Sequence, residues 1–266
     1  MAGTSTTNQV TSRLLPDKVV VITGASQGIG RAVAIACAEN GARLVLHHLG
    51  ESTLSDAESL KADLEKKGTP VTLVYGDISE PTTAAAIVDA AVSAYGRIDV
   101  LVSNAGICPF HSFLDMPLDL WNRTHDVNLT GCFLVTQACA NVMTKMGGGS
   151  IVAISSISAL MGGEFQTHYT PTKAGVKSLM ESCAIALGKY GIRCNSVLPG
   201  TIRTAINEED LSNDAKREGM EARTPLTRLG KPEDIAGPVV FFASDMSAYC
   251  TGASLLVDGG AAISLQ

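Results

Sequence analysis

Short runs of apolar, often β-branched residues alternate with longer helical stretches from residue 18 to residue 258. The first run, at 19–22, is apolar at every position, which is typical of a strand buried on both faces of a parallel sheet. Further runs stand at 44–46, 71–75, 100–102, 150–155, 192–198 and 254–257. The repeated strand and helix units predict an α/β fold with one doubly wound, parallel, seven-stranded sheet and helices on both faces.

The stretches between these strands predict helices at 29–39, 52–67, 81–95, 118–146 and 169–190. The last two are rich in small and apolar residues, so they are candidates for subunit contacts as well as for the core. The segment at 199–228 is polar and irregular, which predicts a mobile flap over a site. No composition break marks a second domain, so we expect one domain at 14–266 after a flexible tail at 1–13.

The net charge and the cysteines of the chain limit its expected binding partners and its expected cellular location. The net charge is −6 and no run of Lys and Arg forms a basic stripe, so neither nucleic acid nor a membrane surface is an expected partner. No apolar run approaches the length of a membrane span. The seven cysteines are scattered and never form a Cys-x-x-Cys pair, which indicates reduced thiols, a cytoplasmic location and no metal site.

A glycine-rich turn from Thr23 to Gly30 lies between the first predicted strand and the first predicted helix. Gly24 and Gly28 permit a tight turn and close approach of the backbone to a pyrophosphate, while Gly30 lets the helix pack on the strand. Amide groups at the helix start would then face the phosphates. A glycine turn without a ligand is the alternative, but its place between a strand and a helix favours a Rossmann-like dinucleotide site.

Tyr169 and Lys173 are four residues apart, and therefore share a face of the predicted helix. A tyrosine, with a pKa of about 10, is too weak a base for an alcohol unless its phenolate is stabilised, and a nearby ammonium group would lower that pKa. Ser156 ends the fifth strand and could meet the same substrate oxygen, while its neighbour Ser155 points to the opposite side. An interfacial tyrosine and a solvated lysine are the alternative.

These motifs together resemble the short-chain dehydrogenase/reductase family. The turn has the family's form Thr-Gly-x-x-x-Gly-x-Gly, and the likeness extends from Lys18 to Gly260. The family spacing selects Ser156 rather than Ser155. It also adds Asn128 as the fourth member of an Asn-Ser-Tyr-Lys tetrad, where a water near the asparagine is thought to relay protons. An asparagine satisfied by its own helical turn is the alternative for this position.

The resemblance implies that the domain binds a nicotinamide dinucleotide. Asp77 would contact adenine, the Asn-Ala-Gly segment at 104–106 would line the cofactor path, and the loop from Pro199 would bind the nicotinamide; ordinary turns are the alternative for each. The implied cofactor residues are Gly24, Ser26, Gln27, Gly28, Ile29, Gly30, Asp77, Asn104, Tyr169, Lys173, Ile202 and Thr204.

The sequence contains only a weak signal for a preference between NAD and NADP. An acidic residue at the end of the second strand suits NAD and arginines there suit NADP, but the segment at 47–51, HHLGE, offers neither clearly. Gln27 replaces a basic residue that many NADP-using members carry in the glycine turn. We therefore expect NAD as the cofactor, with NADP tolerated.

Three segments resemble a narrower group, the L-rhamnose 1-dehydrogenases: NAGICPFHSFLDMP at 104–117, QTHYTPTKAG at 166–175, and LPGTI at 198–202 with the residues that follow it. This resemblance implies oxidation of L-rhamnose at C1 to its lactone, with hydride transfer to NAD(P)+. Phe110 would meet the 6-methyl group, whereas His111 and His168 are expected to be loop or capping residues. The expected substrate contacts are Ser156, Ser158, Gln166, Tyr169, Thr201 and Asn207.

Three other functions remain open. The protein could act on a different aldose, or it could be a 3-oxoacyl-carrier-protein reductase, although the sequence shows no basic surface for an acidic carrier protein. A non-catalytic NAD(P)-sensing interaction protein would be expected to lack a tetrad member, and all four are present. Family members are often tetramers joined through two long helices and the last strand, so a homotetramer is expected.

Overall fold

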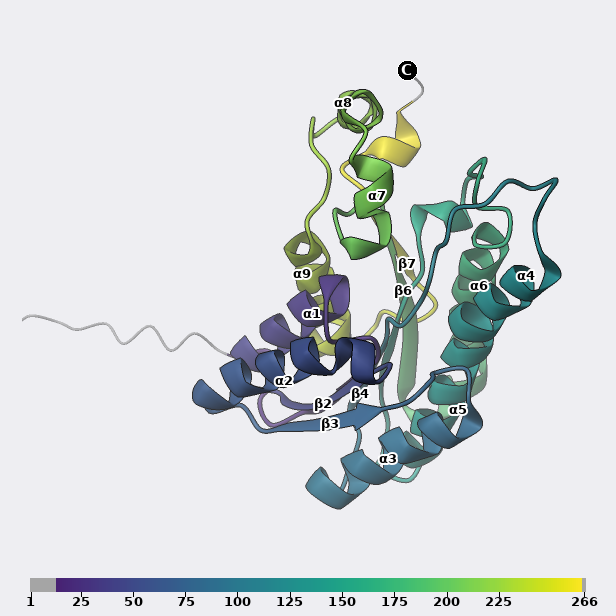
Figure 1. Cartoon of the computed structure of the whole chain (residues 1–266). Helices are drawn as coiled ribbons and strands as arrows, with labels where there is room; N and C mark the ends of the chain where they lie inside the picture. Colours follow the sequence, from purple (N-terminus) through teal and green to yellow (C-terminus); the bar gives the residue numbers. More distant parts are fainter. Residues whose placement is uncertain (1–12, 265–266) are drawn as a thin grey trace, which may run out of the picture.

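The computed structural model describes residues 13–264, so all of the tail expected at 1–13 except Arg13 lies outside the described residues. Seven parallel strands form one sheet, as predicted, and their order is β3-β2-β1-β4-β5-β6-β7 (Figure 1). The strands are β1 (Val19–Ile22), β2 (Arg43–His48), β3 (Val71–Tyr75), β4 (Val100–Ser103), β5 (Gly149–Ile154), β6 (Ile192–Pro199) and β7 (Ser254–Val257). Every residue of β1 and β4 is buried, which explains why β1 is apolar throughout and β4 is apolar up to Ser103.

Helices cover both faces of the sheet (Figure 1). The helices are α1 (Gly28–Glu39), α2 (Glu51–Lys66), α3 (Pro81–Tyr95), α4 (Leu118–His125), α5 (Gly131–Met143), α6 (Thr170–Leu187), α7 (Glu208–Leu211), α8 (Asp214–Arg223) and α9 (Pro232–Ala243). One core cluster joins the sheet to α1, α2 and α9, and the other joins it to α3, α5 and α6. The two clusters make the layered packing that the alternating pattern predicts.

The structure corrects two predictions of local structure. The helix expected at 118–146 is divided into α4 and α5 by a π-helical segment, Asp126–Thr130. The segment at 199–228, expected to be irregular, contains α7 and α8; α8 begins where the side chain of Asn213 accepts a hydrogen bond from Lys216 N, at 3.0 Å. That capping signal is local and could have been found in the sequence.

Helix α9 was not among the predicted helices. Its interior holds Pro238, a residue that usually interrupts a helix. Its start carries clear signals, because Pro232 occupies the first turn and the Asp234 carboxylate accepts a hydrogen bond from Lys231 N at 2.7 Å. Burial of α9 against α1 and the sheet outweighs the proline.

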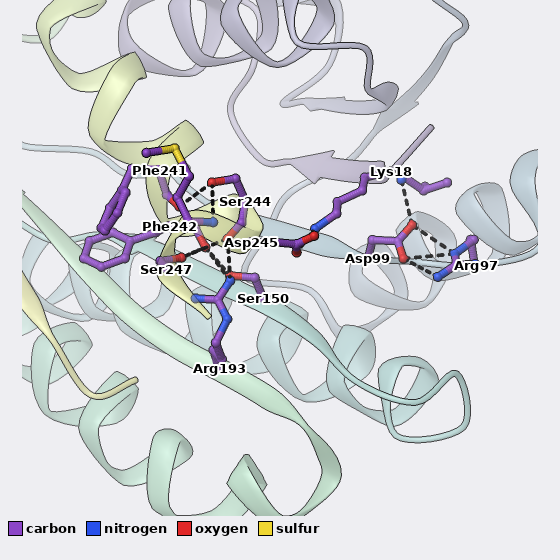
Figure 2. Close-up of polar contacts among 12 residues, drawn as sticks. Lys18, Arg97, Asp99, Ser150, Arg193, Phe241, Phe242, Ser244, Asp245 and Ser247 are labelled. Carbon is purple, nitrogen blue, oxygen red and sulfur yellow. Dashed lines mark hydrogen bonds and ion pairs between the residues drawn. The ribbon is translucent and has the colours of Figure 1, made fainter. Parts of the chain in front are cut away.

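Polar contacts fasten the amino-terminal edge of the sheet (Figure 2). The Asp99 carboxylate accepts a hydrogen bond from Val19 N at 2.9 Å and is paired with Arg97. Arg193, near the start of β6, donates to the carbonyl oxygens of Phe242 at 2.8 Å and Ser244 at 3.2 Å, at the end of α9. A cation at a helix carboxyl end is favourable. The opposite side of the sheet, formed by the carboxyl ends of the strands, is left free for a site. In such folds the site lies where the strand order reverses, here between β1 and β4.

Candidate active site

A cavity of about 940 Å³ lies at the carboxyl ends of the strands. Its walls come from the glycine turn, the ends of β4, β5 and β6, the start of α6, and α8. All of the site residues predicted from the sequence line it except Gly30 and Asn128. Its volume is at the upper end of the usual range for ligand sites, which suits a dinucleotide and a small second molecule.

The glycine turn forms a smooth wall of this cavity. Gly24 and Gly28 have positive φ angles, +63° and +53°, which L-amino acids with side chains rarely adopt. The amide of Asn104 donates to the carbonyl oxygens of Thr23 and Gly24, at 2.9 and 3.0 Å, so the end of β4 supports the turn. The start of α1, at Gly28 and Ile29, faces the cavity. These features fit a bound pyrophosphate.

Gly30 has a role in the packing beneath the turn. A Cβ atom at this position would overlap the carbonyl oxygen of Gly24 and lie 2.7 Å from Asn104 Nδ2. Gly30 therefore does not line the cavity, and its contribution to cofactor binding is to let α1 start directly under the turn. The expectation that Gly30 serves helix packing agrees with this geometry.

Three members of the predicted tetrad meet at the carboxyl end of β5. Tyr169 stands immediately before α6 and Lys173 lies in its first turn, with Nζ 5.6 Å from the centre of the tyrosine ring. Lys173 Nζ also donates to Ile154 O at 2.9 Å, and Ser156 Oγ accepts from Ser158 N at 3.0 Å.

Ser155 differs from its neighbour in the direction of its hydroxyl. Ser155 Oγ donates to the backbone carbonyl of Lys173 at 2.7 Å, which ties β5 to α6. The hydroxyl of Ser156 is the one close enough to Tyr169 to lower the pKa of that phenol. Both serines line the cavity, and the assignment of Ser156 as the catalytic serine stays a prediction.

Burial dominates the titration of this cluster. It raises the pKa of Tyr169 above its ordinary value, although the hydrogen bond with Ser156 acts in the opposite direction. Burial also lowers the pKa of Lys173 to about 8. The expectation that Lys173 lowers the pKa of Tyr169 is therefore not met by these side chains alone, because desolvation disfavours both charged forms.

Replacing Lys173 with methionine should alter the pH dependence of stability. The amine has a pKa of about 8 in the folded protein and 10.5 ordinarily, so between these values only the unfolded chain holds the proton and raising the pH favours folding. Relative to Lys173→Met, the wild type should gain about 2 kcal/mol in free energy of unfolding between pH 7 and pH 9.5. Urea unfolding of both proteins measures this gain; a pH-independent difference would contradict it.

Asn128 lies outside the cavity wall and is fully buried in the π-helical segment. Its Oδ1 accepts from Ile107 N at 2.8 Å, and its Nδ2 donates to Ile107 O at 2.9 Å and Thr172 Oγ1 at 3.2 Å. The side chain thus joins the segment after β4 to α6, and is not satisfied by its own turn as the alternative supposed. π-Helical turns often occur at functional sites.

Asp77, which the family resemblance predicts to contact adenine, lines the cavity and is held in place by a partner that was not predicted. Arg123 Nη2 is 2.6 Å from its carboxylate, and Ser79 Oγ donates to it at 2.7 Å. Burial acts to raise the pKa of Asp77, but the hydrogen bonds from Ser79 and Arg123 outweigh it and hold that pKa below its ordinary value. Arg123 comes from α4, so no local pattern could have paired it with this residue.

Most of the expected substrate residues line the part of the cavity wall formed by the segments after β5 and β6 and by the start of α6. Ser158 Oγ donates to Gln166 Oε1 at 3.5 Å, and Gln166 Nε2 donates to Cys108 Sγ at 3.3 Å. Asn207 is less available than expected, because its amide donates to Ile202 O at 2.9 Å and accepts from Thr204 N at 3.0 Å.

Helix α8 adds residues to this wall that were not predicted. Lys216, Met220 and Arg223 line the cavity, and Lys216 Nζ lies 5.7 Å from the centre of the Phe110 ring. They were missed because the segment was expected to be irregular. His111 and His168 do not line the cavity, and their roles as loop or capping residues stay predictions.

The comparisons with known proteins agree with this geometry. A family model described as Enoyl-(Acyl carrier protein) reductase matches residues 24–262. The chain belongs to the short-chain dehydrogenase/reductase family. Within this family, a gluconate 5-dehydrogenase from Burkholderia cenocepacia, solved in complex with NADP and tartrate, superposes with a TM-score of 0.90 at 30% identity and covers 96% of this chain and 99% of its own.

Two curated family members are similar along nearly their whole length. An L-rhamnose 1-dehydrogenase (NAD(P)(+)) from Sphingomonas sp. is 60% identical over 255 residues, which cover 96% of this chain and all of that protein. An L-rhamnose 1-dehydrogenase (NADP(+)) from Thermoplasma acidophilum is 45% identical over 250 residues, covering 94% and 98%. The family resemblance predicted from separate motifs is thus confirmed.

The described part of the chain, residues 13–264, contains no helix long and apolar enough to cross a membrane. The side chains that the structure describes include no group of three or more His, Cys, Asp or Glu that could hold a metal ion. The cysteines are all free thiols: Cys37, Cys108, Cys132, Cys139, Cys183, Cys194 and Cys250.

Proposed function

We propose that the protein oxidises L-rhamnose at C1 to L-rhamnonolactone, with NAD(P)+ as the hydride acceptor. The observation that carries this proposal is the polar wall of Ser158 and Gln166 beside Tyr169, in a chain that is 60% identical to an L-rhamnose 1-dehydrogenase over 96% of its length. A sugar site needs several hydrogen-bonding groups around one reactive carbon, and such a site rejects analogues that lack an oxygen.

In the proposed reaction Tyr169 accepts the proton of the C1 hydroxyl, and Ser156 orients and polarises the same oxygen. When bound, the oxidised nicotinamide adds a positive charge to the site and accepts the hydride. Lys173 lies in the first turn of α6, close to Tyr169, where its ammonium group, together with the charge of the bound nicotinamide, would favour the phenolate and would bind the cofactor ribose. Asn128 holds the segment next to Lys173 and would support proton exchange with solvent.

The proposed substrate is tested by initial rates with a panel of aldoses, using NAD and NADP separately. L-rhamnose should give the highest kcat/KM among the sugars. If L-rhamnose gives no reduced cofactor while another aldose turns over, the protein is a dehydrogenase for that sugar. Turnover of a 3-oxoacyl substrate alone would support the carrier-protein reductase alternative, and no turnover with intact cofactor binding would support the sensor.

Replacing Gln166 with alanine should raise the KM for L-rhamnose about tenfold, because one buried hydrogen bond to the sugar would be lost. Gln166 lies on the substrate wall, so the Kd for NADH should be unchanged. Steady-state kinetics and NADH fluorescence titration separate the two effects. An unaltered KM would remove Gln166 from the proposed substrate contacts.

Replacing Leu49 with arginine should raise kcat/KM with NADP about tenfold, since a guanidinium group would bind the additional phosphate. Leu49 is 52% exposed and lines the cavity after β2, in the segment that carries no clear signal for NAD or for NADP. Leu54→Arg is the matched control, because this exposed α2 residue does not line the cavity. Equal NADP kinetics for both variants would show that the phosphate is bound elsewhere.

Three features of the organisation are proposed with the activity. We propose one dinucleotide-binding and catalytic domain at 14–266, a cytoplasmic location, and a homotetramer. Exposed apolar side chains on α5, α6 and β7 support subunit contacts, including Phe133, Ile185 and Leu255. Light scattering of the purified protein would give the subunit number directly.

A further inference from the structure

His47, at the end of β2, connects two separate parts of the cofactor wall. Its Nδ1 lies 3.3 Å from the backbone nitrogen of Gly24 in the glycine turn, and its Nε2 lies 2.8 Å from the carbonyl oxygen of Gly76. The side chain is only 2% exposed, yet it lines the cavity. It is the one histidine among the cavity-lining residues described.

The two partners determine the protonation state of the ring. A backbone amide can only donate, so Nδ1 must accept the hydrogen bond from Gly24. A carbonyl oxygen can only accept, so Nε2 must carry the proton that it donates to Gly76. Both contacts therefore require the neutral Nε2–H tautomer, and a doubly protonated ring would place an N–H group against the N–H of Gly24.

Both anchored residues adjoin surfaces that fit the dinucleotide. Gly24 belongs to the turn expected to cradle the pyrophosphate, and the next amide, Ala25 N, is bound to His47 O at 2.9 Å. Gly76 directly precedes Asp77, on the wall expected to contact adenine. The side chain of His47 therefore sets the separation between the phosphate turn and the adenosine wall.

We propose that His47 is a positioning residue for the dinucleotide, acting through Gly24 and Gly76 in its neutral Nε2–H form. This proposal rests on the cofactor site of the proposed function and does not depend on the identity of the sugar. Removal of the Gly24 contact should weaken binding more than removal of the Gly76 contact, because Gly24 is itself part of the phosphate cradle.

Among the groups around His47, this histidine is the one whose protonation would remove the contact with Gly24, and burial keeps it neutral at neutral pH. Burial lowers the pKa of His47, the Gly76 carbonyl raises it, and His48 and Asp77 act in opposite directions. The turn after β1 contributes no titratable group, and Asp77, with its pKa held low by Ser79 and Arg123, stays ionised. The pKa of Lys173 is about 8, so its charge changes at higher pH.

Two substitutions separate the two contacts. The Oδ1 atom of His47→Asn can occupy the place of Nδ1 and keep the Gly24 contact, whereas the amide of His47→Gln can occupy the place of Nε2 and keep the Gly76 contact. Neither titrates near neutral pH. His48→Gln is the matched control, because His48 is bound to Thr53 Oγ1 at 3.2 Å and does not line the cavity.

The test is calorimetric titration with ADP-ribose, which carries the adenosine and the pyrophosphate but cannot react. At pH 7.5, His47→Gln should raise the Kd about tenfold, the effect of one buried hydrogen bond, and His47→Asn should raise it less. Because burial lowers the pKa of His47 from 6.5, the Kd of the wild type and His48→Gln should rise only as the pH falls below 6.5, while the two His47 variants should show a flat profile. Thermal unfolding confirms that each variant is folded.

Three results would overturn the proposal. Equal Kd values for the wild type and both His47 variants would show that the contacts do not position the ligand. Tighter binding at low pH would show that attraction between a charged ring and the pyrophosphate outweighs the lost contact. A pH dependence retained in His47→Asn would assign the titration to another group. Because ADP-ribose binding requires no sugar, failure of the substrate proposal would leave these results unaffected.

Discussion

Replacement of Tyr169 by phenylalanine is expected to lower kcat for L-rhamnose oxidation by roughly 10³-fold, the usual effect of removing a general base. The ring would still fill its buried place before α6, so only the phenolic oxygen beside Ser156 would be lost. Stopped-flow measurement of NADH formation would show whether the chemical step itself has slowed. Retained activity would remove Tyr169 from the proposed reaction.

Two controls distinguish this effect from a general loss of structure. The Kd for NADH should change little in Tyr169→Phe, since the glycine turn and β4 are untouched. Tyr190→Phe makes the same chemical change at the far end of α6, where the side chain is 45% exposed and outside the cavity. That variant should keep wild-type kinetics, and a matching loss of rate in it would point to an indirect cause.

Replacement of Gly30 by alanine is expected to reduce the free energy of unfolding by about 3 kcal/mol, as is usual for overpacking a close contact. The added methyl group would meet the Gly24 carbonyl oxygen and the Asn104 amide, both of which are fixed by hydrogen bonds. Relief of this overlap requires the turn to move, so cofactor affinity should fall as well. Urea unfolding and NADH titration measure the two effects.

Gly237 provides the matched control for this substitution. It lies inside α9, and a Cβ atom there would meet no atom within 4 Å. Gly237→Ala should therefore be neutral or stabilise the protein by up to about 1 kcal/mol, because alanine favours helix more than glycine does. If both variants had the same stability as the wild type, the close approach of α1 to the glycine turn would not be as tight as described.

Much of the fold could be predicted from the sequence because its signals are local. An unbroken apolar run such as 19–22 identifies a strand covered on both faces, and with six further short runs of mainly apolar residues it predicts the observed sheet. The parts predicted least well were those whose signals conflict. Helix α9 contains Pro238, and the π-helical segment lies within an otherwise continuous helical pattern.

The sequence by itself determined the α/β fold, the family and the candidate residues from Gly24 to Thr204. The signals for these are local, because the apolar runs, the glycine spacing and the Tyr-x-x-x-Lys motif each lie within a short stretch of the chain. Only the tertiary structure decided how these residues are held. Asn128 binds Ile107, Arg123 binds Asp77, and His47 joins Gly24 to Gly76. Such partners are brought together by packing from distant segments, and the burial that shifts the pKa values of Tyr169 and Lys173 exists only once those segments have met.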